Sequence, residues 1–432
     1  MNRATDAPTL TRAHAVLNAH APGSRAFWFY DIDAIAARVT QLVAAFAPLA
    51  PRIAYALKAN GLPDIARALS EGGLHADAGS LGELELAAAC GFDAAHRTLS
   101  GNGRTPEEIE WVMAHGVVAV SADAPEELGL LEHAAARAGS RLRVALRVNP
   151  GIVAGGHRHI ATGHAGSKFG MSARQALEAW AVRSRWPHLT LDGMHLHVGS
   201  QIDSTEPLVA TARAAMALAG ESARRGASLA SINLGGGFGV DYSTGGDGLD
   251  LAGYASAIAE LPGARAFEWC FEPGRWLVAS AGTLVAEVLW DKRRDDPQAL
   301  RRFVVIAAGM NDLLRPALYG ARHRIVVVAP PGGAETPADV VGPVCESSDC
   351  FATDVSLPAL RRGALLALLD AGAYGAAMSS NYNGRGRLAE VIHVNGELIL
   401  SRAAEPASAR IAAGANAVRL GAADAARRPQ QR

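Results

Sequence analysis

The sequence predicts a closed (β/α)8 barrel followed by a smaller, mostly antiparallel β domain. Eight short apolar or β-branched segments recur through the first two thirds of the 432-residue chain, and segments with helical spacing separate them. Such alternation is typical of parallel βαβ units, and eight units favour a barrel over the open, doubly wound sheet that is the alternative. After residue 280 long helical segments become rare, and short strands follow one another across Gly/Pro-rich turns.

The barrel is expected over residues 27–280. Its strands are predicted at residues 53–57, 74–77, 97–100, 117–121, 142–148, 191–198, 231–235 and 267–272. Several helical segments between them end in glycine, a common signal for the C-terminus of a helix, as in TPEEIEWVMAHG (105–116). The carboxyl ends of all eight strands would then share one face, where barrel enzymes carry their active sites.

The β domain is expected to comprise residues 1–26 and 281–405. Segments such as RFVVIAA (302–308) and GELILS (396–401) have the composition of strands, and few long helical segments separate them. The remaining residues, 406–432, are rich in alanine and arginine and are expected to form a C-terminal tail.

Composition narrows the class of protein. The 41 basic and 42 acidic residues nearly balance, which argues against a nucleic-acid-binding surface. No apolar run approaches the ~20 residues that cross a bilayer, and the N-terminus lacks the pattern of a signal peptide. The four cysteines have the spacing of neither a disulfide framework nor a metal knuckle. We therefore expect a soluble, cytoplasmic protein without a nucleic-acid or membrane partner.

Chemically active side chains follow the predicted strands at their carboxyl ends. They are Lys58, Asp77, Arg147, Asn149, His195, His197, Ser200, the GGGFG loop at 235–239 and the EPGR segment at 272–275. Taken singly, such a lysine is usually a solvated side chain, and such a glycine run is usually a tight turn. Because a barrel gathers its strand ends at one mouth, we expect these residues to form a single site.

The combination of a lysine, a glycine-rich loop and a carboxylate meets the requirements of pyridoxal phosphate. Backbone N–H groups in the loop can bind a phosphate, and Ser200 can add a donor. A lysine that is partly desolvated near other cations is expected to have a lowered pKa, so its neutral amine can attack a carbonyl and form a Schiff base. The carboxylate can pair with a protonated ring nitrogen.

The HLH pair, His195 and His197, lies on one face of a predicted strand. Such a pair can ligate a metal in a barrel hydrolase. The other strand ends offer no matching set of histidine and aspartate ligands, so we predict no metal site. Stacking on a cofactor ring suits His197, whereas His195 is interpreted as a satisfied core residue.

Several motifs together resemble one family. YALKAN, RVNP, HLHVGSQI, GGGFG, EPGR, GMNDLLRPALYG, GPVCESSD and DAGAYGAAMSSNYNGR are similar to motifs of the fold-type-III pyridoxal-phosphate decarboxylases, the ornithine/diaminopimelate/arginine decarboxylase group. The resemblance extends over residues 27–400. Within the group, the motifs are most similar to those of enzymes that convert meso-2,6-diaminopimelate to L-lysine and carbon dioxide, so this is the activity that the resemblance implies.

The resemblance also implies a set of cofactor-binding residues. Lys58 would carry the cofactor covalently, and Glu272 would hydrogen-bond the pyridinium nitrogen. His197 would stack on the ring, while Asp77 and Arg147 would support the lysine and the cofactor. The phosphate would be held by Gly235, Gly236, Gly237 and Ser200, helped by the backbone around Gly274 and Arg275 and by Tyr374.

The substrate site implied by the resemblance is shared between two subunits of a homodimer. In the family, the GPVCES segment (342–347) comes from the partner subunit. Cys345 would return a proton to the substrate, and Glu346 would bind its distal amine. The distal carboxylate would be bound by Arg275, Arg315 and Tyr319, and Tyr374 would contact both phosphate and substrate.

Three departures from the family pattern keep other activities open. Leu81 stands where a small residue is usual, Gly386 where proline is common, and residues 157–170 are unusually rich in glycine and histidine. A relative that decarboxylates another carboxylate-bearing amino acid in a specialised pathway is therefore an alternative. An ornithine-type decarboxylase, an amino-acid racemase of the same fold and a non-catalytic relative are further alternatives.

Overall fold

The computed structural model describes residues 6–152, 167–295 and 301–414. Eight parallel strands close into a barrel in the order β11-β2-β3-β4-β5-β6-β7-β8. They are β2 (Arg52–Ala56), β3 (His75–Ala78), β4 (Arg97–Leu99), β5 (Ala119–Ala122), β6 (Leu142–Arg147), β7 (Leu189–His195), β8 (Ser231–Asn233) and β11 (Glu268–Phe271). Each overlaps one predicted strand, so the predicted barrel is confirmed and the open sheet is excluded.

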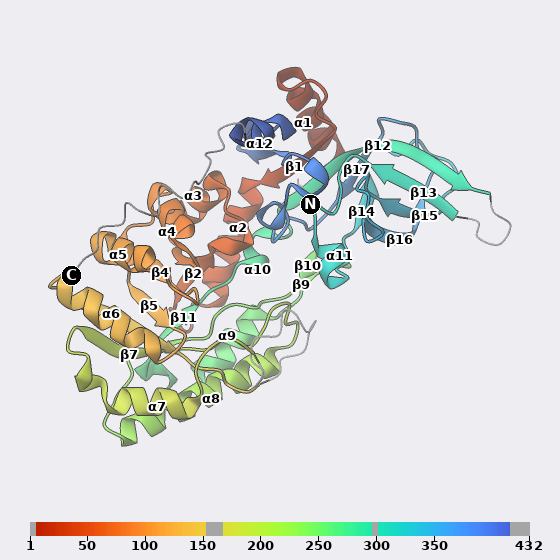
Figure 1. The fold of residues 1–432 in the computed structure, drawn as a ribbon. Helices are drawn as coiled ribbons and strands as arrows, with labels where there is room; N and C mark the ends of the chain where they lie inside the picture. The colour runs from red at the N-terminus through yellow and green to blue at the C-terminus, as the bar shows by residue number, and fades with distance from the viewer. Residues whose placement is uncertain (1–5, 153–166, 296–300, 415–432) are drawn as a thin grey trace, which may run out of the picture.

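Helices surround the barrel (Figure 1). They are α2 (Ile32–Ala45), α3 (Pro63–Glu71), α4 (Leu81–Ala89), α5 (Pro106–His115), α6 (Glu126–Arg137), α7 (Ala173–Ala181), α8 (Thr205–Arg224) and α9 (Leu251–Ala259). Their first turns carry strong local signals: Thr105 and Glu108 form a capping box at α5, and Ser172 and Gln175 form another at α7. No helix in the described ranges combines the length and apolar character needed to cross a membrane.

A second, mixed sheet of nine strands stands beside the barrel (Figure 1). Its main path is β16 (Cys350–Leu357), β15 (Thr336–Val341), β13 (Arg301–Ile306), β12 (Gly282–Arg294), β1 (Ala26–Asp31), β18 (Ala389–Val394) and β19 (Glu397–Arg402), with β17 (Leu365–Leu368) on β12 and β14 (Ile325–Val327) on β17. Most pairs are antiparallel, as predicted, although β1–β18 and β13–β15 are parallel. Strand β1 pairs here although the predicted barrel range starts at residue 27.

Smaller elements complete the fold. They are α1 (Ala7–His20), the hairpin of β9 (Val240–Asp241) and β10 (Gly246–Asp247), α10 (Arg275–Val278), α11 (Arg315–Tyr319) and α12 (Ala407–Gly414). Helix α1 packs through Leu10, Ala13 and Leu17 against Phe27 and Phe29 of the mixed sheet. The predicted C-terminal tail therefore begins as a helix, and residues 415–432 lie outside the described residues.

The segment that follows β17 returns to the mouth of the barrel. The Tyr374 N–H donates to the Ala59 carbonyl (2.7 Å), and the Asn60 side chain donates to the Gly372 carbonyl (3.0 Å). A side chain at Gly372 would overlap the Val278 carbonyl, so only glycine allows this close approach. The mixed sheet thus delivers residues to the carboxyl ends of the barrel strands.

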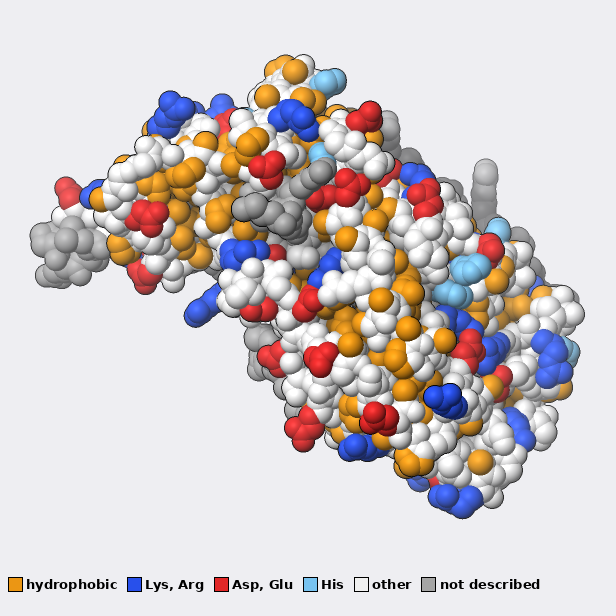
Figure 2. Space-filling model, turned by 180° about the vertical axis from the view of Figure 1, so that it is seen from behind, with side chains coloured by type: hydrophobic (Ala, Val, Ile, Leu, Met, Phe, Trp, Pro, Cys, Tyr) orange, Lys and Arg blue, Asp and Glu red, His pale blue; other side chains and the backbone are white. Residues whose placement is uncertain are grey.

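The surface agrees with the balanced composition. On the face seen in Figure 2, acidic and basic side chains are interspersed among apolar and neutral ones. This distribution matches the sequence, in which basic and acidic residues occur in nearly equal number.

Candidate active site

A cavity of about 530 Å³ opens at the carboxyl ends of the barrel strands. Of the residues predicted for the site, it is lined by Lys58, Asp77, Arg147, His197, Ser200, Gly236, Gly237, Glu272, Gly274, Arg275, Tyr319 and Tyr374. Five individually named residues of the prediction do not line it: Asn149, Gly235, Arg315, Cys345 and Glu346. The cavity is also lined by His195, which was interpreted as a core residue, and by residues that were not predicted for the site, among them Glu83, Ser100 and Phe169.

Lys58 stands on a single 3₁₀ turn that follows β2. The turn spans Leu57–Ala59, and the two residues beside the lysine are buried while its own side chain reaches the cavity. Burial lowers the pKa of Lys58, but the charges of Tyr374, Asp77 and Glu272 outweigh burial and leave that pKa raised from its ordinary value. The predicted lowering is therefore wrong for the cofactor-free protein, because the sequence did not show how closely the carboxylates approach.

Asp77 and Glu272 are the two buried carboxylates of the cavity. Burial, reinforced by the charge of Glu272, raises the pKa of Asp77 to about 7. Burial also raises the pKa of Glu272, against the opposing effects of Lys58 and Asn233. The Ser100 hydroxyl donates a hydrogen bond to Asp77. Ser100 is the last residue of the strand predicted at 97–100, and this position at a strand end is the sequence signal that indicates a place at the barrel mouth.

Glu272 is held by two side chains from neighbouring strands. Asn233 donates to Glu272 Oε1 (2.6 Å), while its own Oδ1 accepts from the Gly235 N–H (2.8 Å). His195 Nε2 lies 3.4 Å from Glu272 Oε2, and its Nδ1 lies 2.7 Å from the Ser121 hydroxyl. Asn233 therefore ties the carboxylate to the first glycine of the glycine-rich loop.

His195 is buried, as expected, but it is more than a satisfied core residue. Its Nε2 has no hydrogen-bond partner in the described part of the chain and faces the Glu272 carboxylate. Burial and the charges of Arg147 and Lys58 lower the pKa of His195 well below the ordinary range, so the ring is neutral at neutral pH. Its neighbour in the HLH pair, His197, also lines the cavity.

The loop after β8 needs its glycines. Gly235 and Gly237 have φ of 65° and 91°, in the region that glycine favours. A side chain at Gly236 would overlap the Glu272 carbonyl, and one at Gly237 would overlap the Gly199 carbonyl. The N–H groups of Gly236 and Gly237 donate to no acceptor within the described residues. These two donors at the cavity wall are suited to an anion.

The residues present fit the predicted cofactor. The backbone donors at Gly236 and Gly237 and the Ser200 hydroxyl can receive a phosphate, and the Lys58 amine can bond an aldehyde carbon. The Glu272 carboxylate, buried and flanked by a neutral histidine, can accept from a protonated ring nitrogen. Pyridoxal phosphate carries these three groups on one molecule.

Two buried arginines lie at this end of the molecule: Arg275 lines the cavity, whereas Arg315 does not. Arg275 follows Gly274 at the start of α10, and Arg315 begins α11. The Arg275 guanidinium donates to the Tyr242 hydroxyl (2.8 Å) and to the Ser200 hydroxyl (3.1 Å). In the described ranges, neither arginine forms an ion pair with a carboxylate. The two guanidinium groups therefore carry positive charge that the protein does not neutralise by direct pairing.

Tyr374 lines the cavity in a strained conformation. Its φ is 56°, which non-glycine residues rarely adopt, and the Arg275 guanidinium carbon lies 4.8 Å from its ring centroid. The next residue, Gly375, is packed so closely on Trp28 that a side chain there would overlap the indole ring. This backbone conformation is held on one side by the hydrogen bond from the Tyr374 N–H to Ala59 of the barrel, and on the other by the packing of Gly375 on Trp28 of the mixed sheet.

Cys345 and Glu346 lie on an ordered loop outside this chain's own cavity. Both are exposed, and the Asp349 carboxylate fixes the loop by accepting from the N–H groups of Met310 and Val344, each at 2.6 Å. A side chain at Gly342 would overlap the Asp349 carboxylate. The first residue of the GPVCESSD motif therefore has to be small because of the contact it makes with the last. The predicted role of Cys345 and Glu346 in a partner subunit's site stays a prediction.

Of the departures from the family pattern, only the segment at 157–170 reaches the cavity lining in the described residues, through Phe169. Leu81 begins α4, where its N–H donates to Glu108 (3.1 Å), and neither Leu81 nor Gly386 lines the cavity. Of the glycine- and histidine-rich segment at 157–170, residues 157–166 lie outside the described residues.

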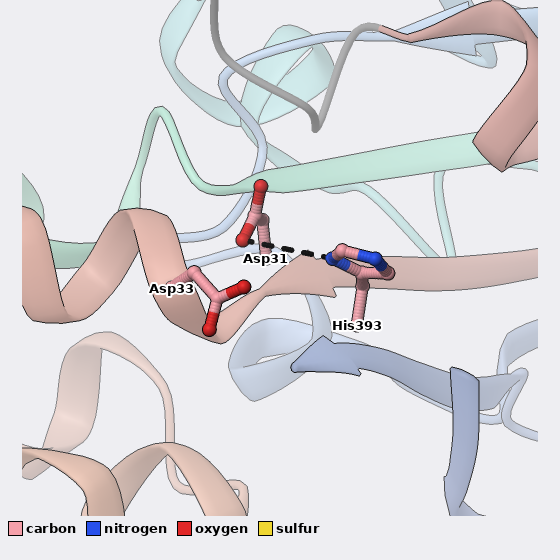
Figure 3. A group of neighbouring side chains, drawn as sticks. All are labelled: Asp31, Asp33 and His393. Atoms are coloured by element: carbon pink, nitrogen blue, oxygen red, sulfur yellow. Dashed lines mark ion pairs between the residues drawn. The ribbon is translucent and has the colours of Figure 1, made fainter. Parts of the chain in front are cut away.

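A group of side chains close enough to share a cation lies elsewhere, at the junction of β1, α2 and β18 (Figure 3). It comprises Asp31, Asp33 and His393, none of which lines the cavity. Asp31 caps α2 by accepting from the Ala34 N–H (3.1 Å), and Asp33 accepts from the Asn395 N–H (3.1 Å) in the β18–β19 turn. Both carboxylates therefore have roles in the fold.

Comparisons with known proteins agree with this geometry. The sequence model of the pyridoxal-dependent decarboxylases, for their pyridoxal binding domain, matches residues 32–279. Diaminopimelate decarboxylase of Neisseria meningitidis serogroup A is 39% identical over 378 residues, which cover 88% of this chain and 92% of the relative.

Solved structures give the same result. Diaminopimelate decarboxylase from Helicobacter pylori, crystallised with L-lysine, matches with a TM-score of 0.85 at 33% identity, over 92% of this chain and 99% of that one. The enzyme from M. jannaschii in co-complex with L-lysine matches with a TM-score of 0.85 at 31% identity, over 94% of both chains.

Proposed function

The chain belongs to the pyridoxal-dependent decarboxylases, and on that premise we propose that it removes one carboxyl group from meso-2,6-diaminopimelate to give L-lysine and carbon dioxide. The observation that carries the choice of substrate is the arginine pair. Arg275 and Arg315 are buried without a carboxylate partner in the described chain. A substrate with a second carboxylate supplies that partner, whereas a substrate that ends in an amine is repelled.

Pyridoxal phosphate supplies a ring that accepts the electron pair left on the α-carbon when carbon dioxide departs. We assign the residues that serve it as follows. Lys58 would hold the cofactor through its aldehyde carbon. The backbone donors of Gly236 and Gly237, with Ser200, Gly274, Arg275 and Tyr374, would bind the phosphate, while Gly235, whose N–H already donates to Asn233, would shape the loop. Glu272 would accept from the ring nitrogen, with Asn233 holding its carboxylate by a hydrogen bond and the neutral His195 ring packed beside it.

Asp77, Arg147 and His197 complete the assignment around the ring. His197, which lines the cavity, would stack on the ring face. Asp77 and Arg147 set the charge around Lys58: the carboxylate favours the protonated amine and the guanidinium favours the neutral amine. Together they allow Lys58 to gain and lose a proton during turnover.

We further propose a homodimer with shared sites. Cys345 is exposed on a loop fixed by Asp349, and it lies outside its own chain's cavity. Placed in the partner's cavity, its thiol donates the proton that replaces the carboxylate, and Glu346 binds the substrate's distal amine. Arg275, Arg315 and Tyr319 bind the distal carboxylate. A cytoplasmic location, which suits four free cysteines, is part of the same proposal.

The test is a substrate panel. Purified protein loaded with pyridoxal phosphate is supplied with meso-diaminopimelate, L-lysine, L-ornithine and L-arginine, and carbon dioxide is measured. We expect meso-diaminopimelate to give a kcat/KM at least about a hundredfold above the others, because two charge-assisted contacts are lost without the distal carboxylate. Faster release from L-lysine or L-ornithine, or racemisation without gas, would contradict the proposal. Lys58→Ala is the inactive control.

A further inference from the structure

We propose that Tyr242 and His323 are positioning residues that hold Arg275 and Arg315 in place for the distal carboxylate, and that they thereby set the preference for a substrate with a second carboxylate. This inference rests on the proposed function and adds two residues to it. Neither residue lines the cavity, so each would act through an arginine.

Tyr242 contacts both arginines with one side chain. It follows the glycine-rich loop directly after β9, and its hydroxyl accepts from Arg275 Nη1 at 2.8 Å. The Arg315 guanidinium carbon lies 4.6 Å from the centroid of the same ring. The hydroxyl therefore orients one guanidinium while the π face supports the other through a cation–π contact. Loss of the hydroxyl should release Arg275 and leave the ring packing intact.

His323 orients Arg315 and also packs edge-on against the Tyr242 ring, with the two ring centroids 5.4 Å apart. Its Nδ1 lies 2.9 Å from the Leu369 carbonyl oxygen, which can only accept, so Nδ1 carries the hydrogen. Its Nε2 is then an acceptor, 3.1 Å from Arg315 Nη1. Burial and the charge of Arg315 lower the pKa of His323 to about 3, so the imidazole stays neutral beside the guanidinium. The tautomer is set by the backbone of the mixed sheet.

All the groups that hold the arginine pair are neutral. Arg275 donates to two hydroxyl groups, those of Tyr242 and Ser200, and Arg315 donates to an imidazole. A carboxylate in any of these places would fix the geometry equally well but would also neutralise the charge. Neutral acceptors fix the guanidinium planes and leave their charge for the ligand. The two guanidinium groups are therefore held in fixed orientations and keep their positive charge. Selective binding of a carboxylate requires both properties.

A pair of ligands isolates this contact. L-lysine retains the carboxylate that is distal in the substrate, whereas 1,5-diaminopentane has the same diamine chain without it. In the cofactor-loaded enzyme acting on meso-diaminopimelate, we expect L-lysine to inhibit more strongly than the diamine. Tyr242→Phe and His323→Leu should each raise the Ki of L-lysine and the KM by about tenfold, the cost of a lost hydrogen bond to a charged group. The Ki of the diamine and kcat should change less than about twofold.

Two matched variants control for packing. His323→Gln keeps an acceptor and should restore most of the affinity for L-lysine, because its amide oxygen can replace Nε2. Tyr254→Phe removes a hydroxyl from a buried tyrosine of α9 that does not line the cavity and should change neither Ki. Equal weakening of both ligands in Tyr242→Phe and His323→Leu, or no weakening, would overturn the positioning role. Equal inhibition of the wild-type enzyme by both ligands would instead overturn the proposed carboxylate site.

Discussion

At the scale of the residue, the cavity is governed by carboxylates that the fold has buried. Asp77 is 2% exposed and lies close enough to Glu272 for that charge to raise its pKa, which reaches about 7. At pH values between the ordinary pKa of aspartate and about 7, Asp77 holds a proton in the folded protein but has lost it in the unfolded chain. The free energy of unfolding therefore falls as pH rises through this window, until a bound cofactor supplies compensating positive charge.

This fall in the free energy of unfolding with rising pH leads to a prediction for Asp77→Asn. In cofactor-free protein, the variant should gain stability relative to the wild type as pH rises from 5 to 8, by about 1–3 kcal/mol, because the amide has no charge to bury. Urea unfolding at both pH values measures the difference. Asp203→Asn, at an exposed position, is the control and should show no such trend. A difference between Asp77→Asn and wild type that does not vary with pH would contradict the prediction.

At the scale of the element, the site depends on connections that are too tight for side chains. The loop after β8 presses on the Glu272 carbonyl at Gly236, and the segment after β17 presses on Val278 at Gly372. Both connections bring backbone to the cavity at places where an added Cβ would displace it. The elements themselves are conventional, so the demand for glycine arises from how closely they meet.

Gly236→Ala tests this demand. The added methyl overlaps backbone that cannot move away easily, so we expect the affinity for pyridoxal phosphate to fall about tenfold or more. Titration followed by visible absorbance measures it. Gly129→Ala is the matched control: Gly129 lies inside α6 with nothing within 4 Å of an added Cβ. It should leave cofactor affinity unchanged and raise the free energy of unfolding by about 0.5–1 kcal/mol. Undiminished cofactor affinity in Gly236→Ala would show that the loop adapts.

At the scale of the whole molecule, the barrel and the mixed sheet meet at the cavity, yet Cys345 is exposed and does not line it. Lys58 and Cys345 are thus separated within one chain, the first in the cavity and the second exposed. A two-fold symmetric dimer can join them, because each subunit then contributes the same loop to the other's cavity.

Subunit mixing tests the shared site. Lys58→Ala and Cys345→Ala should each be nearly inactive alone. Dimers that are dissociated and reassociated from equal amounts of both should recover about a quarter of wild-type activity, since half the dimers are mixed and each mixed dimer has one intact site. Activity is measured as carbon dioxide released per total protein. A mixture that stays inactive while exchange of subunits is demonstrated would place both residues in the same chain's site.

The sequence by itself determined the barrel and the face on which its chemistry lies. Strand periodicity and strand ends are local properties, so Lys58, Asp77, His197 and Glu272 could be placed at one mouth before any coordinates were considered. The glycine run at 235–237 predicted a tight loop for the same reason, because the backbone conformations open to glycine follow from the residue type alone.

Only the tertiary structure decided how those residues behave. The direction of the Lys58 pKa, the contact of His195 with Glu272 and the support of Arg315 by His323 each depend on groups that are distant in the sequence. The same is true of β1, which pairs in the mixed sheet because its partners, β12 and β18, come from the second half of the chain. The pKa of a side chain, its burial and the pairing of a strand all depend on neighbours in space. The linear sequence does not show which residues those neighbours are.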